Sequence, residues 1–386
     1  MQAEDASLSA GDRRLIDRRG VDAMIGRLRA SGRRVIGPTV RDGAIVHDEV
    51  VSVADLPAGV GDEQDGGRYR LTRRADEALF GFSAPSESWK RFLFPPRALL
   101  VRSRRVADGF ELDGPELSVE PLAFLGVRSC DLHAIGIQDR VFLQGTSVEP
   151  IYEARRADVF IVAVNCANPA STCFCASMGT GPKAEKGFDL ALTELLDGAV
   201  HEFLVEVGTA AGAEVLSGVP HVAAVEGDQE RADLVVAAAT AAMGRRLDPT
   251  APRRVSVDVD HPRWDDVAER CLACGNCTMV CPTCFCSSVE DRTDLGGEEA
   301  ERWRRWESCF SLDFSYLHGG PVRSSVTSRY RQWLLHKLVT WEDQFGGSGC
   351  VGCGRCIAWC PVGIDLTAEI AAMDDRSKGG IREGDS

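Results

Sequence analysis

The amino-acid sequence predicts an α+β and α/β domain over residues 1–250, followed by a mainly α-helical domain over residues 255–372. Two observations set this division. Prolines gather between residues 249 and 262, as expected of a linker. Beyond them the composition changes, because residues 264–386 hold eleven of the 15 cysteines and six of the seven tryptophans. The polar tail, residues 373–386, is predicted to be disordered.

The first 110 residues have the mixed pattern of an α+β segment. The stretch LIDRRGVDAMIGRLRASG is predicted to be an amphipathic helix, because apolar residues recur near helical spacing and a glycine ends it. These apolar residues are Leu15, Val21, Ile25 and Leu28. The Gly- and Asp-rich stretch 57–67 is predicted to be a loop.

The middle of the N-terminal domain contains two short, nearly continuous apolar runs, PLAFLGVR (121–128) and ADVFIVAVN (157–165). Such runs are typical of strands buried on both faces. The intervening DLHAIGIQDRVFL is predicted to be a helix with Asp131 at its start. Strand, helix and strand then form a βαβ unit with parallel strands. Another strand is expected at 201–208, and another helix at 232–246 with basic residues in its last turn.

Charge and hydropathy exclude several classes of partner. The formal net charge of −14 argues against nucleic acid or an anionic membrane surface. We find no apolar run near the roughly 20 residues that a membrane-spanning helix needs. The paired arginines near the start of the sequence are not followed by an apolar segment, so no export signal is expected. The protein is therefore expected in the cytoplasm, where clustered cysteines usually indicate metal or redox chemistry and not disulfides.

Two cysteine-rich runs follow the linker: CLACGNCTMVCP begins at Cys271 and CVGCGRCIAWCP at Cys350. Both have the spacing C-x2-C-x2-C-x3-C-P, which is typical of bacterial ferredoxins that hold two [4Fe–4S] clusters. Gly275 and Gly354 are expected to let the backbone approach the cluster sulfurs. The segments GEEAERWRRWESCFSLDFSYL and TSRYRQWLLHKLVTWEDQF between the runs are interpreted as two helices. The sequence therefore predicts an α-helical, bacterial-type ferredoxin domain with two [4Fe–4S] clusters.

The spacing also predicts which cysteines share a cluster. Three closely spaced thiolates bind three corners of one cube, and the fourth cysteine of the run reaches the partner cluster instead. The first cluster is predicted to be held by Cys271, Cys274, Cys277 and Cys360, and the second by Cys350, Cys353, Cys356 and Cys281.

Structural zinc is the alternative interpretation of these runs. Structural zinc sites are usually assembled from separated C-x2-C pairs, so two dense runs of four, each closed by proline, favour iron–sulfur clusters. Under the zinc alternative the protein is a zinc-stabilised scaffold, and a preparation would be colourless and free of iron.

Four further cysteines belong to the predicted βαβ region. Cys130 follows the first apolar run and Cys166 the second, so both are expected at the carboxyl edge of the parallel strands, where open α/β sheets bind ligands. Cys173 and Cys175 follow in the loop STCFCASMGTGP. These four thiols are either the ligands of a third cluster or buried free thiols.

The remaining cysteines are Cys284, Cys286 and Cys309, which are the alternative members of an extra site. The glycine-rich loop that follows Cys175 matches neither a dinucleotide nor a P-loop motif, so a plain turn is favoured over a phosphate or flavin cradle.

A basic stretch in this acidic protein is interpreted as a solvated helical face, with a docking surface for an acidic partner or a charge screen for the clusters as alternatives. Its residues are Arg302, Arg304, Arg305, Arg323, Arg329, Arg331 and Lys337. Tryptophans in the same region are interpreted as core residues, namely Trp303, Trp306, Trp333 and Trp341. No catalytic constellation of side chains stands out.

The sequence resembles a known family in three stretches: GVRSCDLHAIGIQDRVFL, DVFIVAVNCANPASTCFCASMGTGP and GCVGCGRCIAWCPVGIDL. They are similar to the β subunit of soluble sulfhydrogenases, which are NAD(P)-linked [NiFe] hydrogenases, and equally to the electron-transfer subunit of anaerobic sulfite reductase. The likeness runs from about residue 34 to 367, with GRYRL, SWKRFLFPP and CPTCFCSSVED also fitting the family pattern.

The resemblance implies a non-catalytic electron-transfer subunit that carries [4Fe–4S] clusters. Its implied partners are an NAD(P)H-binding flavoprotein subunit and the small and large subunits of a [NiFe] hydrogenase, or the catalytic subunit of a sulfite reductase. The eight cysteines of the two runs match the family's cluster ligands. This chain has GVRSC where GVRPC is expected, a difference that affects no ligand. A reductase subunit that binds flavin near Cys130 and Gly179 remains an alternative function.

Overall fold

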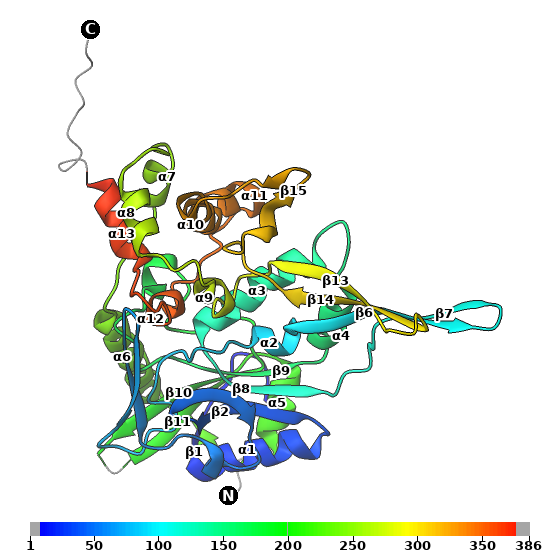
Figure 1. Ribbon diagram of the computed structural model, residues 1–386. Helices are drawn as coiled ribbons and strands as arrows, with labels where there is room; N and C mark the ends of the chain where they lie inside the picture. The colour runs from blue at the N-terminus through cyan, green and yellow to red at the C-terminus, as the bar shows by residue number, and fades with distance from the viewer. Residues whose placement is uncertain (1–7, 199, 376–386) are drawn as a thin grey trace, which may run out of the picture.

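The computed structural model describes residues 8–198 and 200–375, and its largest element is an eight-stranded mixed sheet (Figure 1). Across the sheet the strands are β12 (Val222–Ala223), β1 (Arg13–Asp17), β11 (Val200–Val207), β10 (Leu190–Asp197), β9 (Phe160–Val164), β8 (Leu122–Val127), β2 (Arg34–Arg41) and β3 (Ala44–Glu49). The central strands β10, β9, β8 and β2 are parallel to their neighbours in this group, and the outer pairs are antiparallel. The N-terminal part of the chain is therefore a mixed sheet with helices.

Helices cover both faces of this sheet. They are α1 (Arg18–Ala30), α2 (Lys90–Leu93), α3 (Ser129–Leu143), α4 (Pro150–Arg156), α5 (Ala210–Ser217) and α6 (Glu226–Ala242). Alternate residues of β8 point to opposite faces: Ala123 and Leu125 pack in one core, Phe124 in the other. Burial on both faces explains why this strand is a continuous apolar run in the sequence.

Several predictions for this region are confirmed. Strands β8 and β9 are parallel and α3 connects them, so the βαβ unit is present. The predicted strand at 201–208 is β11, and the predicted helix at 232–246 corresponds to α6, although α6 ends before its expected basic last turn. The predicted amphipathic helix corresponds to α1, except that Leu15 belongs to strand β1.

The prediction of a loop at residues 57–67 is wrong. Residues of this stretch form β4 (Val60–Asp65), which pairs antiparallel with β5 (Arg68–Arg73). Gly66 and Gly67 form the turn, and Gly67 has a positive φ of 68°, a conformation that glycine adopts without strain. A Cβ atom on Gly67 would lie 2.9 Å from the carbonyl oxygen of Cys360, so this hairpin turn packs directly on the end of the second cysteine run.

A second sheet joins two strands that precede β8 with two strands that lie between the cysteine runs. Its order is β13 (Ser287–Thr293), β14 (Glu299–Trp306), β6 (Arg97–Val106) and β7 (Gly109–Asp113), and it projects sideways from the rest of the structure (Figure 1). Two helices were expected between the cysteine runs. The prediction of the first is wrong, because residues 299–306 form a strand. Pairing with β6 provides backbone hydrogen bonds that override the local helix preference. Short strands β15 (Tyr316–Leu317) and β16 (Gly320–Pro321) follow.

The second predicted helix is present and forms part of a separate apolar core. It comprises α10 (Val326–Leu335), a π-helical turn at His336–Thr340 and α11 (Trp341–Phe345). The other helices of this region are α7 (Ala251–Val255), α8 (Arg263–Arg270), α9 (Asn276–Met279), α12 (Arg355–Ala358) and α13 (Leu366–Asp374). Residues 376–386 of the predicted disordered tail lie outside the described residues. Among the described helices, none has the length and apolar character needed to span a bilayer.

Candidate metal centres

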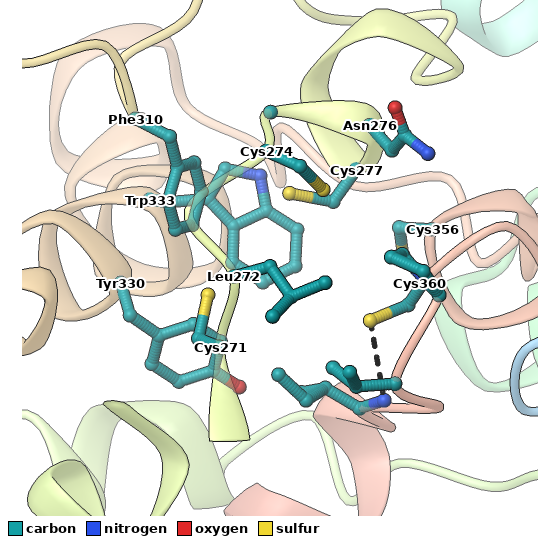
Figure 2. A pocket seen from close by; sticks show the side chains of 14 residues that line it. Cys271, Leu272, Cys274, Asn276, Cys277, Phe310, Tyr330, Trp333, Cys356 and Cys360 are labelled. Carbon is teal, nitrogen blue, oxygen red and sulfur yellow. Dashed lines mark hydrogen bonds between the residues drawn. The ribbon is translucent and has the colours of Figure 1, made fainter. Parts of the chain in front are cut away.

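The first cysteine run lines a cavity whose other walls are mainly apolar. Cys271 directly follows α8, and the run continues through a loop into the short helix α9. Figure 2 shows the sulfurs of four cysteines around a common space, walled by Phe310, Tyr330 and Trp333. These are Cys271, Cys274 and Cys277 of the first run and Cys360 of the second. The cavity can therefore offer four thiol ligands from two segments far apart in sequence.

The second run has the same backbone geometry as the first. Gly275 and Gly354 have φ angles of 76° and 74°, and each precedes a short helix, α9 or α12. Two residues after the first cysteine of each run, Ala273 and Gly352 also have positive φ angles, 49° and 63°. Their backbone N–H groups donate to the Sγ atoms of Cys271 and Cys350, both at 3.4 Å. Both loops are shaped to direct sulfurs inward and to donate hydrogen bonds to them, a known means of tuning iron–sulfur clusters.

The last cysteine of each run lies with the opposite run. Burial raises the pKa of Cys277, and the thiols of Cys271 and Cys360 add to that shift. Burial also raises the pKa of Cys356, with Cys350, Cys353 and Cys281 as further contributors. Cys360 lines the cavity of the first run, and Cys281 lies near thiols of the second run and near Cys277. Cys356 also lines the cavity of the first run, so the two thiol sets adjoin.

Cysteine spacing along the sequence distinguishes between a single zinc ion and a cluster. Among the described residues, no group of three or more His, Cys, Asp or Glu side chains is arranged closely enough to hold one metal ion. A tetrahedral zinc site needs all four sulfurs at about 2.3 Å from one centre. The cavity of the first run offers cysteine thiols from two segments, which is the donor set that a four-iron cluster takes.

Two buried lysines lie beside Cys281, and sequence reasoning missed their role. Lys337, which had been grouped with the basic stretch, lies in the π-helical turn and donates to the Sγ atom of Cys281 at 3.2 Å. Lys90 donates to the carbonyl oxygens of Cys281 and Cys284, at 3.0 and 3.2 Å. Neither ammonium forms an ion pair with a carboxylate of the described residues. Buried charges are normally compensated, so Lys337 in particular favours an anionic group beside Cys281.

Thiol neighbours alter the ionisation of these groups. Burial lowers the pKa of Lys337, but the charges of Cys281, Cys284 and Cys350 outweigh it and raise this pKa overall. A hydrogen bond with the Cys284 thiol lowers the pKa of Cys281, and the charge of Lys337 adds to this effect. The lowered pKa favours the thiolate form of Cys281, which is the form that ligates metals.

The three remaining cysteines lie close to the same lysines. Cys286 and Cys309 are hydrogen-bonded to each other, which lowers the pKa of Cys286 to about 7. Cys284 is hydrogen-bonded to Cys281. These contacts therefore form two thiol pairs, and Cys281, one member of the second pair, belongs to the second predicted cluster.

The basic stretch is not one helical face, because Arg329 and Arg331 lie on α10 and three other arginines lie on a strand. Arg302, Arg304 and Arg305 lie on strand β14, where each forms an ion pair: with Asp291 at 2.7 Å, Glu149 at 2.7 Å and Glu290 at 3.5 Å, respectively. The apolar residues Ala300, Trp303 and Trp306 recur every three residues, so no period-two alternation marks this strand in the sequence. Trp333 and Trp341 are core residues as predicted, whereas Trp303 and Trp306 are half-buried.

Comparison with known proteins supports an iron–sulfur protein. A family of 4Fe-4S dicluster domains matches residues 270–364, which include all eight cysteines of the two runs. The chain is also 34% identical, over 327 residues, to sulfhydrogenase 2 subunit beta of Pyrococcus furiosus. That similarity covers 82% of this chain and 91% of the Pyrococcus protein.

Proposed function

The chain belongs to the sulfhydrogenase beta-subunit family, and we propose that it is the iron–sulfur electron-transfer subunit of a hydrogenase complex. The observation that carries this proposal is the pair of cysteine loops with matching backbone geometry, which place two sets of thiols side by side. Bound [4Fe–4S] clusters supply one-electron transfer, which needs closely spaced centres and no catalytic side chains.

We assign the ligands as the sequence predicts, with the fourth cysteine exchanged between the runs. The first cluster is held by Cys271, Cys274, Cys277 and Cys360, and the second by Cys350, Cys353, Cys356 and Cys281. The cavity lined by the first set and the position of Cys281 beside Cys350, Cys353 and Cys356 support this assignment. Residues 255–372 form the proposed ferredoxin domain and residues 1–250 the domain on which it docks.

The proposed partners are an NAD(P)H-binding flavoprotein subunit and the [NiFe] subunits of the hydrogenase, in the cytoplasm. The similarity to a sulfhydrogenase subunit favours this assembly over a sulfite reductase, which stays an alternative. A neighbouring gene for a NiFe large subunit or for a sirohaem reductase distinguishes the two. Flavin bound to the isolated chain at near-stoichiometric level would instead favour a flavin-binding reductase subunit.

Anaerobic purification from the native organism tests the proposal directly. We expect the chain to co-purify with a flavoprotein and a nickel-containing enzyme, and the separated full chain to be brown and bleached by dithionite. The cysteine spacing of the two runs and the thiols that line the shared cavity are the physical reason. A colourless chain with stoichiometric zinc would contradict the proposal and select the scaffold alternative.

Removing the charge of Lys337 should make the reduction potential of the second cluster more negative. A buried cation near the cluster stabilises the reduced, more negative state, and Lys337 is 3.2 Å from a ligand sulfur. We expect Lys337→Met to lower the potential in a redox titration followed by electron paramagnetic resonance, and Lys337→Arg to shift it less. Lys186→Met, at an exposed lysine, is the control. An unchanged potential in Lys337→Met would disprove this role.

A further inference from the structure

Four thiols gather at one edge of the large sheet, outside the two cysteine runs. Cys130 lies in the first turn of α3, just after β8, and Cys166 follows the parallel neighbour β9. Cys173 and Cys175 come from the loop that follows Cys166. Cys130, Cys173 and Cys175 are only 7–8% exposed, and Cys166 is half-buried. The parallel pairing of β8 and β9 thus brings together cysteines from three segments.

Three of the four thiols belong to one packed group that includes Cys353, a ligand of the second cluster. Cys130, Cys173 and Cys175 pack together with Met243, Val351 and Cys353. The Sγ atom of Cys175 lies 3.9 Å from the Sδ atom of Met243. Cys166 lies near this group, because its charge adds to the effect of burial and raises the pKa of Cys173 and Cys175. The charge of Cys353 has the same effect.

The cysteine loop is fixed against the second run by backbone contacts. The N–H of Phe174 donates to the carbonyl oxygen of Gly352 at 2.8 Å, and the Thr180 hydroxyl donates to the carbonyl oxygen of Val351 at 2.7 Å. A Cβ atom on Gly352 would lie 2.7 Å from the backbone of Cys175, so the approach requires glycine. Cys175 and the loop of the second cluster therefore form one rigid unit.

A buried positive charge lies near one of the four thiols, Cys166. Arg128 is 3% exposed, and its guanidinium donates to the carbonyl oxygens of Asn165, Phe80 and Phe82. It forms no ion pair with a carboxylate of the described residues. Burial raises the pKa of Cys166, and the charge of Arg128 partly opposes this shift. Burial of an unpaired charge is unfavourable, so an anionic group at these thiols would compensate it.

We propose that Cys130, Cys166, Cys173 and Cys175 bind a third [4Fe–4S] cluster, next to the second one. The third site goes beyond the two clusters of the proposed function and does not depend on which enzyme is the partner. Buried free thiols are common singly, but four of them, with the buried Arg128 guanidinium near Cys166, form a complete ligand set.

Metal analysis of the full-length chain, purified anaerobically, tests the third site. The unaltered chain should contain about twelve iron atoms and as many acid-labile sulfides, because each cubane has about four of each. The double variant Cys173→Ser/Cys175→Ser should lose about a third of both, and keep the resonance signals of the other two clusters. Met243→Leu is the matched control, since it changes the packing around Cys175 and keeps every thiol.

Two results would overturn the third site. One is an iron content of about eight atoms in the unaltered chain, which does not depend on how any variant folds. The other is stoichiometric zinc that is lost in the double variant while the iron stays constant. Co-purification with hydrogenase subunits is measured separately, so failure of the proposed function and failure of this site are distinguishable.

Discussion

Replacing Cys360 by alanine is expected to remove the cluster of the first run, although Cys360 belongs to the second run in sequence. Its sulfur faces the cavity that Cys271, Cys274 and Cys277 line, and it accepts a hydrogen bond from the N–H of Ile364 at 3.3 Å. The iron content should fall by about four atoms per chain. Electron paramagnetic resonance should show the loss of the same signal that Cys271→Ala removes.

The reciprocal variant gives the matched control. Cys281→Ala should remove the signal that Cys350→Ala removes, because Cys281 lies beside the thiols of the second run and Lys337. If Cys360→Ala instead reproduces Cys350→Ala, each run holds its own cluster and the crossed assignment is wrong. Comparing whole spectra among the four variants avoids any need to assign a signal in advance.

The sequence contains local signals for the parts of the fold that depend on neighbouring residues. Strands β8 and β9 are buried on both faces, so nearly every residue of each is apolar and the pattern is unambiguous. The cysteine runs are equally local, because a tight loop must carry three ligands at fixed spacing. Glycine at 275 and 354 was predicted for close approach, and both residues do adopt the positive φ that the loops require.

Contacts between distant segments could not be predicted in the same way. Strand β14 forms because β6 pairs with it, and Arg102 and Glu301, which form an ion pair across these strands, are 199 residues apart. Charged residues on both strands resemble a helix surface in composition, so local propensity favoured the wrong element. The positions of Lys90 and Lys337 could not be predicted for the same reason, because only folding brings both residues beside Cys281.

Arg355→Met should destabilise the protein strongly, because it breaks the ion pair that joins the second cysteine run to the N-terminal domain. Arg355 is fully buried and binds Asp131 at 2.9 and 3.1 Å, and its Nε donates to the carbonyl oxygen of Pro85 at 2.6 Å. Removing one partner of a buried pair leaves the other charge uncompensated, which typically costs about 3–5 kcal/mol. Denaturant unfolding under anaerobic conditions measures this loss, with iron content determined in parallel.

The double variant Asp131→Asn/Arg355→Met separates charge from packing. It removes both charges, so it should be less destabilised than Arg355→Met alone if the stranded carboxylate is the main cause. Arg302→Met is the control at an exposed ion pair with Asp291, where solvent screening leaves only a small loss of stability. A loss equally small in Arg355→Met would mean that the two domains are held together by apolar and backbone contacts alone. A large loss of stability in Arg355→Met would instead imply that this ion pair fixes the third thiol group against the ferredoxin domain. Asp131 directly follows Cys130, and Arg355 lies between two ligands of the second cluster.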